Sequence, residues 1–190
     1  MLDVALAFLA DEFNAYLLRR TGSLAVGKME IGALLDDTGK LAINKGTVRL
    51  CIINIEEERA TRAQLPERIL VDGREMTLPP ELRLNLTVLA AADMTGYDTT
   101  LKGLSQVLAF FQSHPVFTVD DYPGLDPRLG QLSVEMFSAS HETLNQIWAC
   151  LGAKYLPSVL YKVRLVSIQD REPERFGAPI TDIAIDLHDK

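Results

Sequence analysis

The sequence predicts an α+β domain in which about three helices flank a mixed, largely antiparallel sheet. Three segments place apolar residues at helical intervals, which is typical of amphipathic helices with one buried stripe. Other segments alternate apolar and polar residues or are apolar throughout, as strands are. The order along the chain is helix, three strands, helix, strand, helix, strand and a possible last strand, which favours helices grouped on one sheet.

The first third of the chain predicts a helix and then strands. The helix covers residues 2–20, and Thr21-Gly22-Ser23 ends it. Its apolar positions are Leu2, Leu6, Leu9, Phe13 and Leu17. Residues 24–35 are strand-like, and residues 36–40 (DDTGK) predict a turn between strands.

The middle of the chain predicts a buried strand, a loop and a half-exposed strand. Residues 47–55 (TVRLCIINI) are apolar on both faces at their centre, as a central strand covered on two sides would be. A charged run follows directly: Glu56, Glu57, Glu58 and Arg59. Residues 60–80 are polar and end in two prolines, which predicts a loop. Residues 82–88 alternate leucine or valine with polar residues, which predicts a half-exposed strand.

Two further helices are expected. One covers about residues 98–113 and ends at His114-Pro115, because proline cannot continue the helix. Its predicted inner stripe is Leu101, Leu104, Leu108 and Phe111. A strand follows around residues 132–137, and Ser140 is the expected N-cap of the next helix, with Gly152 as the residue that ends it. The predicted buried face of this helix is Leu144, Ile147, Trp148 and Leu151.

Residues 159–168 predict a strand that carries two cations on one face. Val159, Tyr161, Val163 and Leu165 fall on one side by alternation, and Lys162 and Arg164 fall on the other. Residues 169–179 are a polar break, and residues 180–187 (ITDIAIDL) alternate again. A face with two cations on a largely apolar strand meets either water or an acidic neighbour.

Composition excludes several classes of function. The 190 residues are 47% hydrophobic and 24% charged, as in a globular protein with ample material for a core. A formal net charge of -7 argues against a nucleic-acid partner, which needs a basic surface. No stretch approaches a membrane span, and acids interrupt the first apolar run, so a signal peptide and a membrane partner are not expected. Cys51 and Cys150 are expected to be buried free thiols in a protein made in the cytoplasm.

No candidate catalytic, metal or cofactor site emerges, so we expect no enzyme activity and no cofactor. Asp37-Thr38-Gly39 matches the tripeptide around an aspartic-protease carboxylate, but Lys40 follows it and a turn explains the same residues. His114, His141 and His188 have no second ligand at a metal-compatible spacing. The sequence lacks a glycine-rich phosphate loop and a nucleophile elbow.

The charges that remain suggest contact between protein surfaces. Glu56 and Glu58 share one side of their strand, and Lys162 and Arg164 share one side of another. In a ring of identical subunits, the acids of one subunit could meet the cations of the next. Alternatively, the two strands are neighbours within one subunit and the charges pair there. The sequence leaves both possibilities open.

Four segments resemble the N-terminal domain of the tail-terminator, or cap, proteins of extracellular contractile injection systems of the antifeeding-prophage and virulence-cassette type. They are ALAFLADEFNAYLLRR, IINIEEERATR, LPPELRLNLTVLAAADMTGYDTTLKGLSQVLAFFQSHPVFT and LNQIWACLGAKYLPSVLYKVRLVSI. The resemblance covers about residues 5–168, and its specific parts are NIEEER and LGAKYLPSVLYKVR. It implies a structural ring, expected to be six-fold, that sits on the last inner-tube disk, stops tube and sheath polymerisation, and joins the two.

The resemblance also sets the expected domains and partners. We expect a terminator-like domain over 1–168 and a C-terminal extension over 169–190 that supplies a possible extra strand, where longer relatives carry a further domain. The expected partners are copies of the same chain, the inner-tube protein and the sheath protein, and the protein would be assembled in the cytoplasm and then become part of the particle. An alternative is an assembly adaptor or chaperone for tube or sheath subunits that does not stay in the particle. The residues expected at subunit or tube interfaces are Glu56, Glu57, Glu58, Arg59, Lys154, Lys162, Arg164, Ile183, Ile185 and Leu187.

Overall fold

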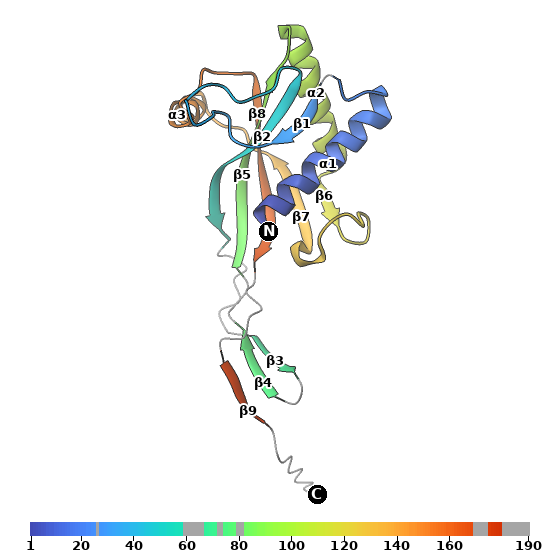
Figure 1. Cartoon of the computed structure of the whole chain (residues 1–190), viewed down its shortest axis with the longest axis vertical. Helices are drawn as coiled ribbons and strands as arrows, with labels where there is room; N and C mark the ends of the chain where they lie inside the picture. Colours follow the sequence, from blue (N-terminus) through green and yellow to red (C-terminus); the bar gives the residue numbers. More distant parts are fainter. Residues whose placement is uncertain (26, 59–66, 72–73, 79–81, 169–174, 180–190) are drawn as a thin grey trace, which may run out of the picture.

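The structure is a computed structural model that describes residues 1–25, 27–58, 67–71, 74–78, 82–168 and 175–179. A six-stranded sheet in the order β1-β2-β5-β8-β7-β6 forms the body of the molecule (Figure 1). Its strands are β1 (Lys28–Ile31), β2 (Thr47–Glu57), β5 (Leu82–Asp93), β6 (Val116–Thr118), β7 (Gln131–Met136) and β8 (Ser158–Ile168). Only β1 and β2 pair in parallel, so the sheet is mixed and largely antiparallel, as expected.

A second sheet of three strands, which we call the arm sheet, stands beyond one end of the body (Figure 1). Its strands are β3 (Glu67–Val71), β4 (Arg74–Leu78) and β9 (Arg175–Pro179), in the order β3-β4-β9. The chain leaves the body after β2, returns to it at β5, and leaves again after β8. Since β2 and β8 both run antiparallel to β5, these three points lie at the same end of the body sheet. The prediction that residues 60–80 are a loop is therefore wrong, because they include a paired hairpin.

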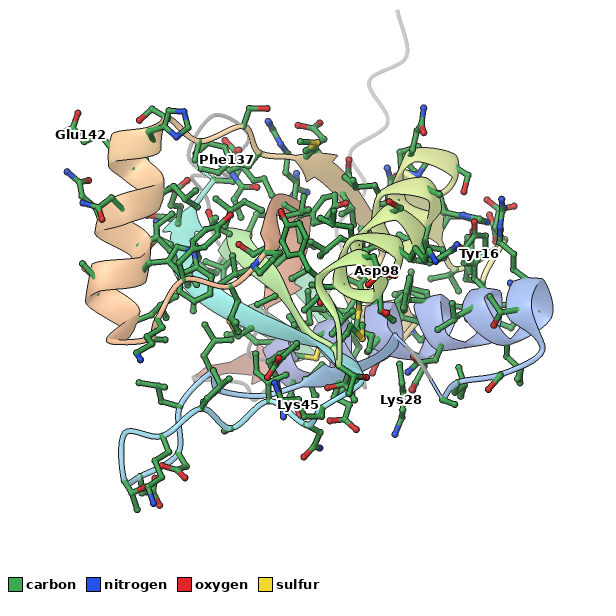
Figure 2. All side chains as sticks on the ribbon, turned by 90° about the horizontal axis from the view of Figure 1, so that it is seen from above. Tyr16, Lys28, Lys45, Asp98, Phe137 and Glu142 are labelled. Carbon is green, nitrogen blue, oxygen red and sulfur yellow. The ribbon has the colours of Figure 1, made fainter. Side chains whose placement is uncertain are left out.

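Two helices cover one face of the body sheet. They are α1 (Leu2–Thr21) and α2 (Tyr97–Ser113), and Figure 2 shows them on the opposite side of the sheet from α3 (His141–Leu151). The core beneath α1 and α2 includes aromatic rings packed edge to face, such as Phe13 against Phe110 at 5.6 Å between ring centroids. Tyr161 and Val163 of β8 reach this core, which confirms the side predicted for them.

The opposite face of the sheet is only partly covered. Trp148 of α3 is buried against Cys51, Leu89 and Leu160, and the other predicted apolar residues of α3 pack around it. The helix begins where predicted, because the Ser140 side chain accepts a hydrogen bond from the backbone N–H of Thr143 at 3.1 Å. It ends at Gly152, whose φ of 66° is left-handed. The rest of this face, toward the arm sheet, has no helix over it among the described residues.

Several sequence predictions fail in detail. The inner stripe of α2 is formed by Leu104, Val107, Phe110 and Phe111, whereas Leu101 and Leu108 are 44% and 37% exposed. The predicted stripe lay too far round the helix, because α2 is buried on two sides, against α1 and against the sheet. Only residues 28–31 of the strand-like segment 24–35 form a strand, and β6 was not predicted.

The turn at residues 36–40 is present, but it does not join two strands. It closes a single antiparallel bridge between Leu35 and Leu41, and β1 pairs with β2 in parallel instead. The Asp36 carboxylate accepts hydrogen bonds from Thr38 and from the Lys40 backbone N–H, and the bond from Thr38 is the main cause of its lowered pKa. Gly39 takes a φ of 76°. The DTG tripeptide is thus part of a turn, in accord with the simpler interpretation.

Bulges change the alternation of two strands. On β2 the register shifts between Ile52 and Asn54, so that Asn54, and after it Glu56, lie on the side of the sheet that α3 partly covers. On β8 the register shifts after Val163, so that Val166 rather than Leu165 lies opposite Leu84. The predicted alternation through Leu165 therefore ends one residue pair earlier.

Both cysteines are free thiols, as expected, but they differ in burial. Cys51 is buried, and this burial raises the pKa of its thiol to about 11. Cys150 is exposed on α3, so the prediction that both are buried is wrong for Cys150. Among the described helices, none is long and apolar enough to cross a membrane.

Candidate assembly surfaces

The uncovered part of the α3 side of the sheet carries four charged residues, two cations on one strand with an acid on either side, which we call the charged ladder. From strand to strand they are Glu56 on β2, Lys162 and Arg164 on β8, and Glu135 on β7. Lys162 Nζ lies 2.8 Å from Glu56 Oε2, across the intervening strand β5, and Arg164 Nη2 lies 2.9 Å from Glu135 Oε2. Exposed pairs of this kind contribute about 0–1 kcal/mol each, so the ladder sets the charge pattern of the surface more than it stabilises the fold.

The acidic run beside the ladder is held by amide side chains. Asn54 Nδ2 donates to Glu56 Oε1 at 3.0 Å, and Asn85 Nδ2 donates to Glu58 Oε2 at 2.8 Å. Asn85 is 5% exposed although it lies in the strand predicted to be half-exposed. No helix lies over this part of the α3 side among the described residues, and the Asn85 side chain is buried between the flanking strands β2 and β8, bonded to Glu58.

The ladder bears on the two possibilities that the sequence left open. The Lys162–Glu56 pair is a contact within one subunit, as in the second possibility, and Arg164 pairs with an acid of β7 that sequence reasoning had not singled out. A role of these charges between subunits stays a prediction. Lys154 is exposed in the turn between α3 and β8, and it has no ion pair among the described residues. Arg59, Ile183, Ile185 and Leu187 lie outside the described residues.

The β1 edge of the sheet is closed by a side chain. Asn14 of α1 accepts a hydrogen bond from the Met29 backbone N–H at 2.8 Å, and its Nδ2 donates to the Met29 carbonyl at 3.0 Å. These are the two groups that an added strand would use. The neighbouring Ile31 carbonyl accepts from Arg49 Nη1 at 3.0 Å. A strand can therefore add at β1 only by displacing these side chains.

The β6 edge is open at Val116, whereas the carbonyl of Thr118, the next outward-facing residue, accepts a hydrogen bond from the Tyr122 N–H at 2.9 Å. Val134 N–H donates to the Pro115 carbonyl at 2.8 Å, so Pro115 and Val134 form a hydrogen-bonded pair where β6 and β7 run antiparallel. Because hydrogen-bonded and non-bonded pairs alternate, the N–H and C=O of Val116 point away from β7. Val116 is 41% exposed, and among the described residues neither of its backbone groups has a hydrogen-bond partner.

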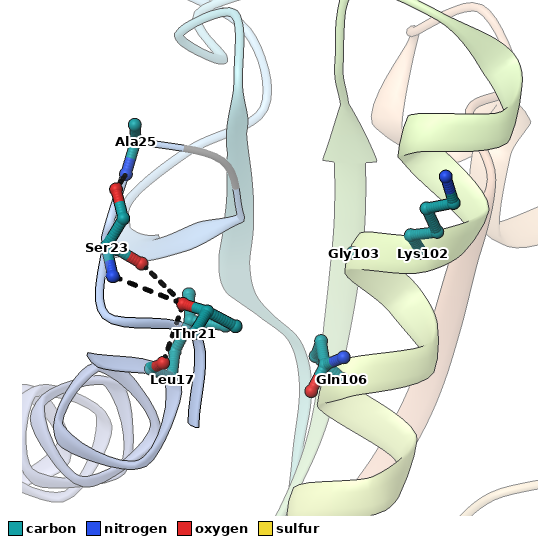
Figure 3. Close-up of a pocket in the computed structure, with 7 residues that line it drawn as sticks. All are labelled: Leu17, Thr21, Ser23, Ala25, Lys102, Gly103 and Gln106. Atoms are coloured by element: carbon teal, nitrogen blue, oxygen red, sulfur yellow. Dashed lines mark hydrogen bonds between the residues drawn. The ribbon is translucent and has the colours of Figure 1, made fainter. Parts of the chain in front are cut away.

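A small cavity of about 230 Å³ lies between the end of α1 and α2 (Figure 3). Thr21 closes its wall by donating to the Leu17 carbonyl, and Gln106 lies on the opposite wall. The Oε1 atom of Gln106 is buried without a partner among the described residues. Gly103 lies close to Met94, so a Cβ at this position, 2.6 Å from Met94 Cε, would require the end of the methionine side chain to move. The cavity holds no cluster of titratable groups, and no group of potential metal ligands occurs among the described residues.

Two solved structures share this fold. One is described as the sheath/tube terminator of an extracellular contractile injection system, PVC, in the extended state; it matches with a TM-score of 0.61 and 17% identity, over 95% of this chain and 62% of that chain. The other is described as the tube-terminating cap of the anti-feeding prophage, with a TM-score of 0.57 and 18% identity, over 93% of this chain and 60% of that chain. This chain therefore spans less than two thirds of either protein. No curated protein matches the sequence.

The fold is thus the α+β fold of tube-terminating proteins, with three helices on a mixed sheet. The sequence gives the family itself: the chain belongs to the Pvc16 N-terminal domain family, whose pattern matches residues 5–182. This confirms the resemblance found in the sequence.

Proposed function

We propose that this chain is the terminator, or cap, subunit of a contractile injection system. The observation that carries the proposal is the family match over residues 5–182, together with a fold shared across 95% and 93% of the chain with two terminator proteins. The subunit acts by binding rather than by chemistry. It forms a ring, six-fold by the family resemblance, on the last inner-tube disk, where it stops tube and sheath polymerisation and joins the two.

The physical basis of termination is a difference between two surfaces. A tube disk repeats one adhesive surface that recruits the next disk, so growth continues until a ring binds that surface without presenting it again. Exposed strand edges are the usual adhesive element of sheets. The closed β1 edge, with both Met29 backbone groups bound by Asn14, supports a subunit that withholds such an edge on one side.

The partners follow from this role. They are further copies of the chain, the inner-tube protein and the sheath protein, and the subunit is made in the cytoplasm before it joins the particle. The alternative, an adaptor or chaperone for tube or sheath subunits, predicts that the chain is absent from finished particles.

The test is the composition and length of particles. We expect purified particles to contain the chain at one ring per tube, and particles from cells lacking it to be longer and irregular in length. Particles of normal, uniform length in those cells contradict the proposal. A chain that is needed for assembly but absent from particles favours the adaptor.

The charged ladder permits a sharper test of its role between subunits. Reversing Lys162 and Arg164 to Glu places like charges beside Glu56 and Glu135, so stability and assembly are both expected to suffer. The matched control reverses all four, with Glu56→Lys and Glu135→Arg added, which restores both pairs within the subunit. If the four-fold variant regains stability but not ring assembly, the ladder serves an interface. If it regains both, the pairs act only within the subunit.

A further inference from the structure

The two edges of the body sheet differ in a way that bears on assembly. At β1, side chains from Asn14 and Arg49 occupy the outward backbone groups. At β6, the outward N–H and C=O of Val116 have no partner among the described residues. An added strand is held by main-chain hydrogen bonds, so the edge of this sheet that can accept one without displacing a side chain is β6, at Val116.

A groove of about 590 Å³ runs beside the β6 edge. Its lining combines the largely apolar side chains of Pro115, Val116 and Tyr122 with charged ones, Glu12, Arg19 and Asp121. Recognition by strand addition uses such a hollow to hold alternate side chains of the incoming segment, while the edge supplies the hydrogen bonds. The open edge and the groove share Val116, so one extended segment can use both.

The arm sheet delivers a segment with the right pattern. In its register, Arg175 pairs with Thr77 and Pro179 pairs with Arg74, so β9 runs from the body toward the turn between β3 and β4. The chain therefore leaves β9 at the end of the arm sheet farthest from the body (Figure 1). The eight residues that follow, 180–187, alternate as a strand does and include Ile183, Ile185 and Leu187.

We propose that residues 180–187 of one copy add as a strand to the β6 edge of a neighbouring copy, beside Val116. The donor segment and the acceptor edge are different surfaces of the same chain, so the contact is heterologous and, repeated around an axis, closes a ring. This rests on the proposed function, which requires a ring, and it names the contact that forms it. The occupant of the edge is a second copy because the segment starts at the far end of the arm sheet from its own body.

Substitution at Val116 tests the edge directly. Val116→Pro removes the outward N–H donor and leaves the β6–β7 hydrogen bonds intact, because the N–H of Val116 takes no part in them. Val116→Ala is the matched control, since it shortens the side chain and keeps the donor. We expect both variants to fold, as judged by circular dichroism and thermal melting, and only Val116→Pro to lose the ring in sedimentation and electron microscopy of the full chain. Rings from Val116→Pro overturn the proposal.

Cross-linking identifies the occupant and stays informative if Val116→Pro fails to fold. A photo-reactive side chain at position 185 of the full chain is activated in a mixture of isotopically heavy and light copies. The expected product joins residue 185 of one copy to the segment 115–122 of the other, as heavy–light peptide pairs. Cross-links within one copy, cross-links to another surface, or no cross-link between copies overturn the proposal.

Failure of this inference is distinguishable from failure of the terminator role. If Val116→Pro forms rings and restores normal particle length in cells lacking the chain, strand addition at β6 is wrong and the terminator function stands. If particle length never depended on the chain, the function itself is wrong, whatever contact holds its copies together.

Discussion

Asn14 is the residue whose removal should most directly open the β1 edge. Its amide makes two hydrogen bonds to one residue of the edge strand, to Met29 N–H at 2.8 Å and to Met29 C=O at 3.0 Å, in a partly buried setting. Each such bond contributes about 0.5–1.5 kcal/mol net, so Asn14→Ala should lower the free energy of unfolding by about 1–3 kcal/mol. Urea denaturation followed by circular dichroism measures this loss.

Asn14→Asp separates the two bonds by pH. The carboxylate still accepts from Met29 N–H, but it has no proton to donate and faces the Met29 carbonyl oxygen. Burial and this oxygen disfavour the charged form, so the pKa of the new carboxyl is raised in the folded state. The stability that the protonated carboxyl contributes is then fully present at a pH below the pKa of this carboxyl in the unfolded chain. It is lost as the pH rises through the pKa of the same carboxyl in the folded protein. The variant should therefore approach the wild type on acidification, measured relative to Asn14→Ala at each pH.

The control is Asn44→Ala. Among the described residues the Asn44 side chain bonds only to the side chain of Glu30, at an exposed site, so its loss should cost less than about 0.5 kcal/mol. The edge-closing reasoning is refuted if Asn14→Ala is as stable as Asn44→Ala. It is also refuted if the penalty of Asn14→Asp is the same across the pH range. Increased self-association of Asn14→Ala, seen by light scattering, is the expected consequence of an opened edge.

Three further outcomes follow from the structure. Near neutral pH, a thiol reagent should modify exposed Cys150 rapidly and leave Cys51 unmodified. Cys51 should react in the folded protein only as the pH approaches the pKa of its thiol, about 11. Mass spectrometry of digests measures the two rates of modification, and equal rates would contradict the burial of Cys51. Gly152→Ala should cost about 1–2 kcal/mol because φ is 66°, whereas Gly124→Ala, with open space around it and no positive φ, should be near neutral in the same melts. Ser140→Ala should cost about 1 kcal/mol through loss of the α3 cap, and Ser140→Asp should recover most of it.

The sequence predicted those elements whose signal is local. Ser140 and Gly152 bound α3 as expected, because capping depends on residues within one turn. Pattern alone misplaced the buried stripe of α2, because which side of a helix is buried depends on what packs there, and α1 packs against Phe110, which the predicted stripe did not include. The hairpin of β3 and β4 was missed because its two five-residue strands, ERILV and REMTL, are short and do not alternate clearly between apolar and polar residues.

The candidate surfaces were less accessible to sequence reasoning. The pairing of Lys162 with Glu56 was one of two possibilities, and the partner of Arg164 was not foreseen, since it depends on β7 lying next to β8. The closed edge depends on a contact between Asn14 and Met29, fifteen positions apart, that an asparagine on an amphipathic helix does not signal. The open edge depends on β6, a three-residue strand too short to recognise from its pattern.

The extra residue in β2 decides which charges the molecule shows. Ile53 has no partner across from it on β5. Because of this extra residue, the side chains of β2 that follow it lie on the opposite side of the sheet from the one that regular alternation would give them. Counted without this insertion, Glu56 would stand opposite Leu84, on the side of the sheet that α1 and α2 cover, and Lys162 would be left with Glu135, which lies opposite it on β7. Insertion or deletion of a single residue at this point would thus move the side chains that follow it on β2 to the other side of the sheet. The charges that this surface carries therefore depend on the length of the chain here as well as on which residues it contains.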